Sequence, residues 1–380
     1  MKNVLLYLFV IPISLSAQKI DTLKFYSEAF NQERSIYIQT PANYKYASAD
    51  VKFPVLYILE GQHDWFVEPC IQLVNSLQKT KEVPQMVIVV VPLEDRKAEC
   101  NVDSLNGPDL PLHTFITKEV AKKLKTYRAE GYNTLVGHSF SASFALYSLI
   151  RSVDFYDAVF ANSPLDALEL LISELSKQPQ KTLDKIYYSV GGADQSKDRY
   201  HHTAYSKLRN EFPDFFNNIH AFEATFSSPN AVPIVSMPNF LSECFTPFHN
   251  RYSEIAKVDM NYKLLNPPQK IENEISLILQ ASKLGNMNYP PEIADYNGIA
   301  SRYLNSEFYE HALGIYLQAM EDYPNYYEFP SYAAEISIKL KPDTAKYLIQ
   351  KAIELLNKFE SNLPEKNEYI DQLNALLKKQ

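Results

Sequence analysis

The chain has 380 residues, 46% of them hydrophobic, and a formal net charge of −8 at pH 7. This length exceeds that of one typical domain, and the hydrophobic content excludes a disordered chain. The acidic balance, with basic residues dispersed along the sequence, argues against nucleic acid or an anionic membrane as the main partner. We therefore expect two globular domains.

The first residues have the pattern of a secretory signal peptide. Lys2 precedes the apolar residues 4–15, and the small residues Ser16 and Ala17 provide a cleavage site. The apolar stretch is too short to span a bilayer comfortably, and Pro12 interrupts it. We expect a signal peptide at residues 1–17 and export to the periplasm or the medium, with no membrane span. A buried first strand or helix is the alternative.

Residues 18–249 alternate short apolar runs with amphipathic segments. Strands are expected at residues 35–40, 55–59, 86–91, 133–136, 158–161, 186–190 and 219–224. Helices are expected at residues 115–127, 140–151, 165–177, 204–212 and 234–245. Continuous apolar runs of strand length are typical of strands buried on both faces. Their alternation with helices indicates an α/β domain with a doubly wound, mainly parallel sheet.

A different pattern follows this domain. Residues 250–289 have the character of a linker with some helix, and residues 290–380 are helical by period. Eight positions in this last part have the spacing of a tetratricopeptide unit: Tyr296, Ile299, Ala300, Tyr303, Ala312, Tyr316, Ala319 and Pro324. We therefore expect a small all-α repeat domain that packs against the α/β domain and recruits a protein partner; an ordinary helical hairpin is the alternative.

Ser139 lies where an apolar strand turns sharply into an amphipathic helix, in the sequence Gly-His-Ser-Phe-Ser. This context is typical of a nucleophile elbow, in which a strained turn presents a serine hydroxyl at the edge of a parallel sheet. A serine nucleophile needs a base, an acid and backbone donors for the oxyanion. We expect the acid to be Asp194 and the oxyanion or binding residues to be Gly61, Gln62 and Phe140.

Several segments resemble the esterase family of α/β-hydrolases that includes siderophore esterases, feruloyl-type esterases and S-formylglutathione hydrolase. These segments are residues 54–61, 132–140 and 190–194, with further likeness at residues 95–96. The resemblance covers roughly residues 20–248. It implies a serine nucleophile at Ser139, an acid at Asp194 and oxyanion donors near Gly61 and Phe140. It also implies a small-molecule ester as the ligand, without a metal or cofactor.

The sequence departs from that family in two ways. Ser141 replaces an elbow glycine, and Ser143 replaces a second small residue. The loop after the last strand, which usually provides the catalytic histidine, has Phe226 or Pro229 at that position, depending on the alignment. Other histidines reach the site only by an unusual backbone path or are structural: His113, His138, His201, His202, His220 and His249.

The sequence is therefore consistent with two functions. The first is an exported serine ester hydrolase whose activity is weak or lost because the histidine is missing. The second is a non-catalytic binding module of the same fold. A nucleotide enzyme is excluded because no glycine-rich phosphate loop opens the first helix. Three cysteines match no zinc site and are expected to be buried thiols: Cys70, Cys100 and Cys244.

Overall fold

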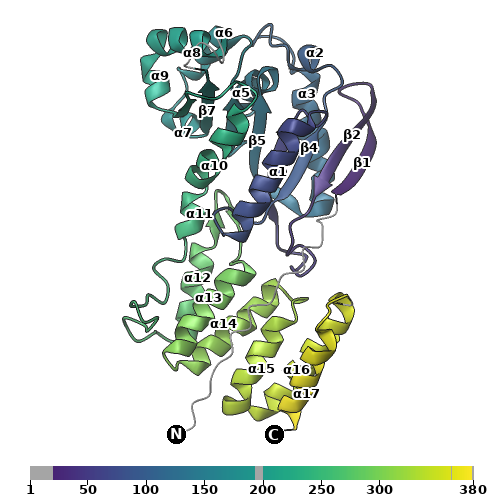
Figure 1. Ribbon diagram of the computed structural model, residues 1–380, viewed down its shortest axis with the longest axis vertical. Coiled ribbons are helices and arrows are strands. Elements are labelled where there is room, and N and C mark those ends of the chain that lie inside the picture. Colours follow the sequence, from purple (N-terminus) through teal and green to yellow (C-terminus); the bar gives the residue numbers. More distant parts are fainter. Residues whose placement is uncertain (1–19, 193–199, 361, 379–380) are drawn as a thin grey trace.

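An eight-stranded sheet forms the centre of the α/β part of the molecule (Figure 1). The structure is a computed structural model and describes residues 20–192, 200–360 and 362–378. In sheet order the strands are β1 (Ile20–Ser27), β2 (Gln32–Gln39), β4 (Val87–Val91), β3 (Phe53–Leu59), β5 (Ala129–His138), β6 (Ala158–Asn162), β7 (Ile186–Gly191) and β8 (His220–Ala224). β1 pairs with β2, and β2 with β4, in antiparallel orientation. The remaining neighbours, in the sheet order β4, β3, β5, β6, β7 and β8, pair in parallel. The predicted α/β class is confirmed.

The strand pattern follows from burial. Every residue of β3, β4, β6 and β7 is buried, as the continuous apolar runs predicted. β1 alternates between exposed and half-buried residues along most of its length, because it is the edge strand of the sheet. This strand lies outside the strands that the sequence pattern predicts.

Helices flank the sheet, and α5 begins directly after β5. They are α1 (Asp64–Lys79), α2 (Arg96–Cys100), α3 (Pro111–Thr114), α4 (Ala121–Leu124), α5 (Phe140–Arg151), α6 (Leu168–Leu175), α7 (Gln180–Leu183), α8 (Tyr200–Glu211), α9 (Pro213–Asn217), α10 (Val232–Cys244) and α11 (Thr246–Asn250). α5 packs on β5 and β6, and α1 packs against α10. Helix α1 was not predicted; Pro69 lies inside it, where proline normally ends a helix.

Further helices form the C-terminal part (Figure 1). They are α12 (Ile271–Ala281), α13 (Ile293–Asn305), α14 (Tyr309–Asp322), α15 (Glu328–Leu340), α16 (Pro342–Phe359) and α17 (Lys366–Leu377), with a short hairpin of β9 (Lys283–Leu284) and β10 (Met287–Asn288) after α12. Consecutive helices from α13 to α17 pack against each other. The repeat positions from Tyr296 to Ala319 are buried, but assignment to the tetratricopeptide class stays a prediction.

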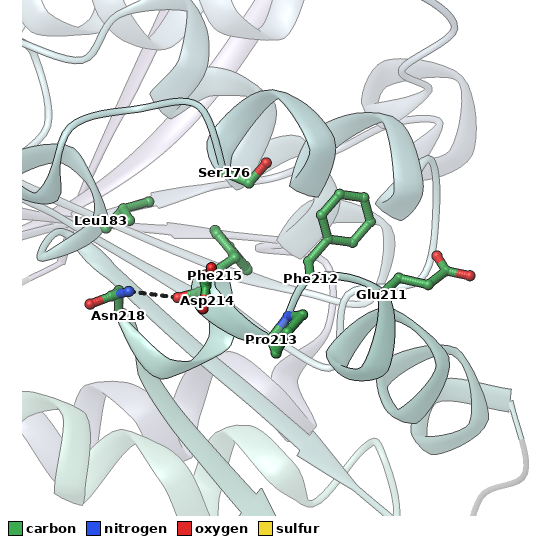
Figure 2. Close-up of a pocket in the computed structure, with 8 residues that line it drawn as sticks. All are labelled: Ser176, Leu183, Glu211, Phe212, Pro213, Asp214, Phe215 and Asn218. Atoms are coloured by element: carbon green, nitrogen blue, oxygen red, sulfur yellow. Dashed lines mark hydrogen bonds between the residues drawn. The ribbon is translucent and has the colours of Figure 1, made fainter.

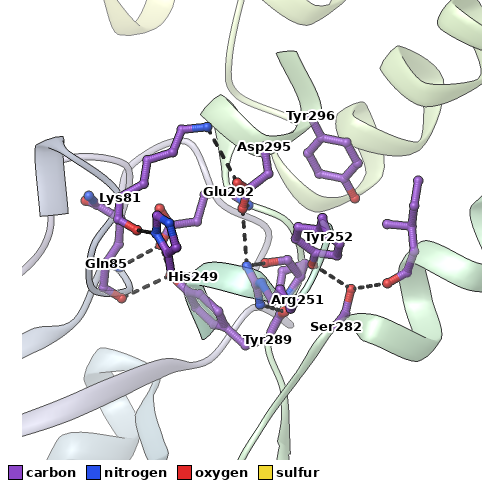
Figure 3. Close-up of polar contacts among 12 residues, drawn as sticks. Lys81, Gln85, His249, Arg251, Tyr252, Ser282, Tyr289, Glu292, Asp295 and Tyr296 are labelled. Carbon is purple, nitrogen blue, oxygen red and sulfur yellow. Dashed lines mark hydrogen bonds and ion pairs between the residues drawn. The ribbon is translucent and has the colours of Figure 1, made fainter. Parts of the chain in front are cut away.

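The helical part packs against the α/β part. Near the start of the chain, Ser48 N–H donates to Asp322 O at 2.8 Å, and Lys45 forms an ion pair with Glu360 at 3.0 Å. A second group of contacts lies between the end of α1 and the start of α13 (Figure 3). There the buried Glu292 carboxylate accepts the backbone N–H of Gln85 at 2.6 Å. These polar contacts hold the two parts together.

Candidate active site

Ser139 occupies the turn between β5 and α5, as predicted. Its backbone has φ 57° and ψ −115°, a conformation that L-residues rarely adopt and that marks local strain. A Cβ on Gly137 would lie 2.3 Å from the carbonyl oxygen of Ser141, so only glycine allows the strand and helix to approach this closely. The Ser139 N–H donates to Asn162 O at 2.9 Å, which ties the turn to β6.

The two serines that depart from the family pattern have hydrogen-bond partners within the fold. Both residues are fully buried. Ser141 Oγ donates to Glu60 Oε1 at 2.7 Å and accepts the N–H of His138 at 2.8 Å. Ser143 Oγ accepts the N–H of Asp166 at 2.9 Å and of its neighbour Leu165 at 3.1 Å. Serine can therefore replace the smaller family residue at both positions without leaving a buried hydroxyl unpaired.

The carboxylate of Glu60 lies next to the elbow and accepts hydrogen bonds from three side chains. Its side chain is fully buried, and its backbone has a positive φ of 64°. In addition to Ser141, it accepts His63 Nδ1–H at 2.7 Å and Arg96 Nη1–H at 3.2 Å. The Arg96 guanidinium lies 5.4 Å from the centre of the Phe140 ring. A buried carboxylate and a cation thus lie directly beside the elbow.

The His63 and Trp65 rings lie side by side, with 5.8 Å between their centres. Trp65 also packs edge-on against His138, at 5.4 Å. His63 is 31% exposed, whereas His138 is buried. Burial lowers the pKa of the His138 imidazole to about 4, so this ring is neutral at pH 7. His63 and Trp65 therefore form a half-open aromatic surface next to the residue that precedes Ser139.

Two backbone amides qualify as oxyanion donors. Phe140 is the first residue of α5, where a helix leaves its N–H groups without intrahelical acceptors. The N–H of Gln62 makes no hydrogen bond to another described residue, and its side chain accepts Leu93 N–H at 2.9 Å. The Gly61 N–H, in contrast, donates to Val91 O at 3.1 Å. The donor role predicted for Gly61 is thus better assigned to Gln62. Gly61 is needed for close packing, because a Cβ at this position would lie within 3.0 Å of Val90 and Pro92.

The loop after β8 reaches the elbow without providing an imidazole. The carbonyl oxygen of Pro229 accepts His138 Nε2–H at 3.0 Å, so this loop lies where the alignment places it. Phe226 is 83% exposed and has no proton-accepting group. The predicted acid, Asp194, lies outside the described residues.

Most of the other predicted histidines are occupied elsewhere. His113 is buried and pairs with Ser148 Oγ at 2.7 Å. His220 pairs with Glu243 at 2.7 Å, and His202 lies 3.6 Å from Glu223. His201 is half-buried at the start of α8. His63 is not among the histidines weighed in the sequence analysis; it follows Glu60 by three residues, in the segment that is expected to provide oxyanion donors.

One pocket lies away from the elbow. Its volume is about 300 Å³, and it lies between α6, α7, α8 and α9. Figure 2 shows its lining residues: Ser176, Leu183, Glu211, Phe212, Pro213, Asp214, Phe215 and Asn218. None of the elbow residues lines it.

No cluster of three or more metal-ligating side chains occurs in the described part of the chain. Within the same residues, no helix is long and apolar enough to cross a membrane. The elbow is therefore the best candidate for the active site.

Residues 27–211 match the family model described as "Putative esterase". This stretch contains the elbow and the Glu60 cluster and ends with α8, before the loop that follows β8. Over 174 residues the chain is 26% identical to the uncharacterized protein YjcH of Bacillus subtilis (strain 168). The alignment covers 44% of this chain and 70% of that protein. The predicted esterase resemblance is thus supported for the α/β part.

Two solved structures share the fold. An IroE-like serine hydrolase from Shewanella oneidensis aligns with a TM-score of 0.58 and 17% identity, over 78% of this chain and 98% of that chain. An uncharacterised protein from Capnocytophaga ochracea aligns with a TM-score of 0.55 and 16% identity, over 94% of this chain and 100% of that chain. At these identities the likeness shows the α/β-hydrolase-like fold alone.

Proposed function

We propose that this protein is a serine hydrolase that cleaves small-molecule carboxylic esters, with Ser139 as its nucleophile. The strained turn at Ser139 carries the proposal, because a non-glycine residue at φ 57° between a parallel strand and a helix is the defining geometry of a nucleophile elbow. The match of residues 27–211 to an esterase family supports the reaction class.

The neighbouring groups fit acyl transfer. The N–H groups of Phe140 and Gln62 are the proposed oxyanion donors. The acid that the family resemblance implies is Asp194, which lies outside the described residues. Trp65 is 42% exposed beside the elbow and offers an apolar surface for the acyl or alcohol group of the ester. We propose export of the protein on the basis of residues 1–17.

A non-catalytic binding module is the second candidate. It is favoured by one observation: the loop after β8 brings Pro229 rather than a histidine to the elbow. In that case the helical part would recruit a protein partner while the elbow binds a ligand without turnover.

Hydrolysis of p-nitrophenyl acetate and butyrate separates the two candidates. The wild-type protein is expected to turn over either ester, and Ser139→Ala to lower kcat/KM about 100-fold or more. Ser76→Ala, an exposed serine on α1, is the matched control and should retain full activity. Equal rates for the wild type and Ser139→Ala would reject the hydrolase and favour the binding module.

A further inference from the structure

We propose that His63, oriented by Glu60, is the general base that activates Ser139. The loop after β3 would then provide both the base and the carboxylate that orients it, and Glu60 would take the role that the family resemblance gives to Asp194. This inference rests on the proposed function, because it requires Ser139 to be the nucleophile.

The pairing of Glu60 with His63 has the geometry of a catalytic acid and base. His63 Nδ1 donates to a fully buried carboxylate at 2.7 Å. A carboxylate that accepts the Nδ1 proton fixes the ring tautomer and leaves the lone pair on Nε2. Ser141 and Arg96 hold the same carboxylate from other directions, so Glu60 cannot rotate away from the ring without breaking further bonds. The imidazole is therefore pre-oriented.

The pair lies against the elbow through three separate contacts. Trp65 links His63 to His138, the residue before Ser139. Arg96 links Glu60 to Phe140, the residue after Ser139. The third contact is the direct hydrogen bond of Glu60 to the Ser141 hydroxyl, two residues beyond Ser139. Glu60 and His63 are thus connected to the residues on both sides of Ser139.

Exposure favours His63 over other paired histidines. The His63 side chain is 31% exposed, so part of the ring is accessible to a ligand, while its Nδ1 partner is fully buried. His220 and His202, in contrast, pair with the partly exposed carboxylates of Glu243 and Glu223. His138 donates its Nε2–H to Pro229, and its pKa of about 4 makes it a weak base.

The proposed steps conserve protons and electrons. His63 Nε2 takes the Ser139 hydroxyl proton as Oγ forms a bond to the ester carbonyl carbon, and the negative charge moves to the carbonyl oxygen. When the tetrahedral intermediate collapses, the carbon–alkoxide bond breaks and His63 returns the proton to the leaving alcohol. A water molecule then attacks the carbonyl carbon of the acyl-enzyme and gives a proton to His63. As this second tetrahedral intermediate collapses, the bond from the carbon to Ser139 Oγ breaks, His63 returns the proton to Oγ, and the carboxylic acid leaves.

The test compares ester hydrolysis in two variants of His63. His63→Gln keeps an N–H donor for Glu60 but accepts no proton, and His63→Ala leaves space for a free imidazole. Both are expected to lose about 100-fold or more in kcat/KM, and millimolar imidazole is expected to restore part of the activity of His63→Ala. The His63 side chain makes no capping hydrogen bond to the backbone of α1, and Ser141 and Arg96 still pair with Glu60 in both variants, so both variants should fold. His220→Ala is the matched control and should retain wild-type rates.

The outcomes separate this inference from the proposed function. If the wild type and Ser139→Ala are equally slow, the proposed function fails and the base is irrelevant. If Ser139→Ala is inactive but both His63 variants hydrolyse at the wild-type rate, the inference is overturned. It is also overturned if His63→Ala is inactive and imidazole restores nothing, or if only His201→Ala abolishes activity. His201, which is half-buried at the start of α8, is the competing base.

Discussion

The hydroxyl of Ser141 donates to the carboxylate of Glu60, with 2.7 Å between Oγ and Oε1. This bond joins the first turn of α5 to the loop after β3, and both side chains are fully buried. A family glycine at this position would leave the carboxylate with His63 and Arg96 only. The serine is thus part of the network that holds the Glu60 carboxylate against the His63 ring.

Ser141→Ala should lower the free energy of unfolding by about 2 kcal/mol, because it removes a hydrogen bond to a buried charged group. Urea denaturation of the wild type and the variant measures the change. Ser76→Ala, on the exposed face of α1, should change stability by less than about 0.5 kcal/mol. Equal stability of Ser141→Ala and the wild type would show that the network does not depend on this bond.

Gly137→Ala should destabilise the protein by about 3 kcal/mol or prevent folding. The added Cβ would lie within 2.7 Å of three backbone atoms of α5, and backbone cannot move aside cheaply. Gly298→Ala is the control: its Cβ would meet nothing within 4 Å in α13, so it should stabilise the helix by about 0.5–1 kcal/mol. Thermal unfolding distinguishes the two. A Gly137→Ala protein of normal stability would contradict the close packing at the elbow.

Glu292 makes stability depend on pH. Burial raises the pKa of its carboxyl from 4.5 to about 7, with a further contribution from the charge of Asp295. Since a raised carboxyl pKa means that the folded state binds the proton more tightly, this stabilisation is complete below about pH 4.5 and is lost as pH rises through 7. The loss amounts to about 3 kcal/mol.

Urea denaturation of the wild type and Glu292→Gln at pH 5, 6, 7 and 8 measures this effect. The wild type should lose stability relative to the glutamine variant across that series, because glutamine does not ionise. The comparison subtracts the titration of other buried carboxyls, such as Asp157 and Asp322, whose pKa values burial also raises. A constant difference between the two proteins at all four pH values would contradict the assignment.

Arg251 stabilises the junction between the α/β and helical parts (Figure 3). Its side chain is 4% exposed, donates to Tyr289 O at 2.7 Å and pairs with Asp295 at 3.3 Å. Arg251→Met should lower the free energy of unfolding by about 3–5 kcal/mol, because it leaves a partly buried carboxylate without its main cation. Lys81→Met, which removes the more exposed cation 3.6 Å from Asp295, should cost about 0–1 kcal/mol. Similar losses in both variants would contradict this ranking.

The sequence predicted the parts of the molecule that depend on local patterns. Continuous apolar runs identified the buried strands, and the strand-turn-helix pattern located Ser139 at the end of β5. Edge strand β1 and helix α1 were missed, because β1 has no fully apolar run and Pro69 interrupts the helical pattern of α1.

The arrangement around Glu60 could not be derived in the same way. Its contacts to Ser141 and Arg96 join segments that are 81 and 36 residues apart in sequence. Local periodicity carries no information about such contacts, whereas the pairing of Glu60 with His63 spans only three residues and was readable as a tight turn. Burying a carboxylate without a hydrogen-bond donor has a large free-energy cost, so Glu60 needs partners. Which side chains provide them depends on the tertiary fold.

Covalent labelling tests most directly whether Ser139 is an activated nucleophile. The folded protein is incubated with a fluorophosphonate, which phosphonylates nucleophilic serines, and the modified residue is located by peptide mass spectrometry. The account predicts one adduct per chain on Ser139, absent from Ser139→Ala and from protein unfolded in urea before labelling. Absence of an adduct on Ser139 in the folded wild type, or equal labelling of Ser139 before and after unfolding, would contradict it.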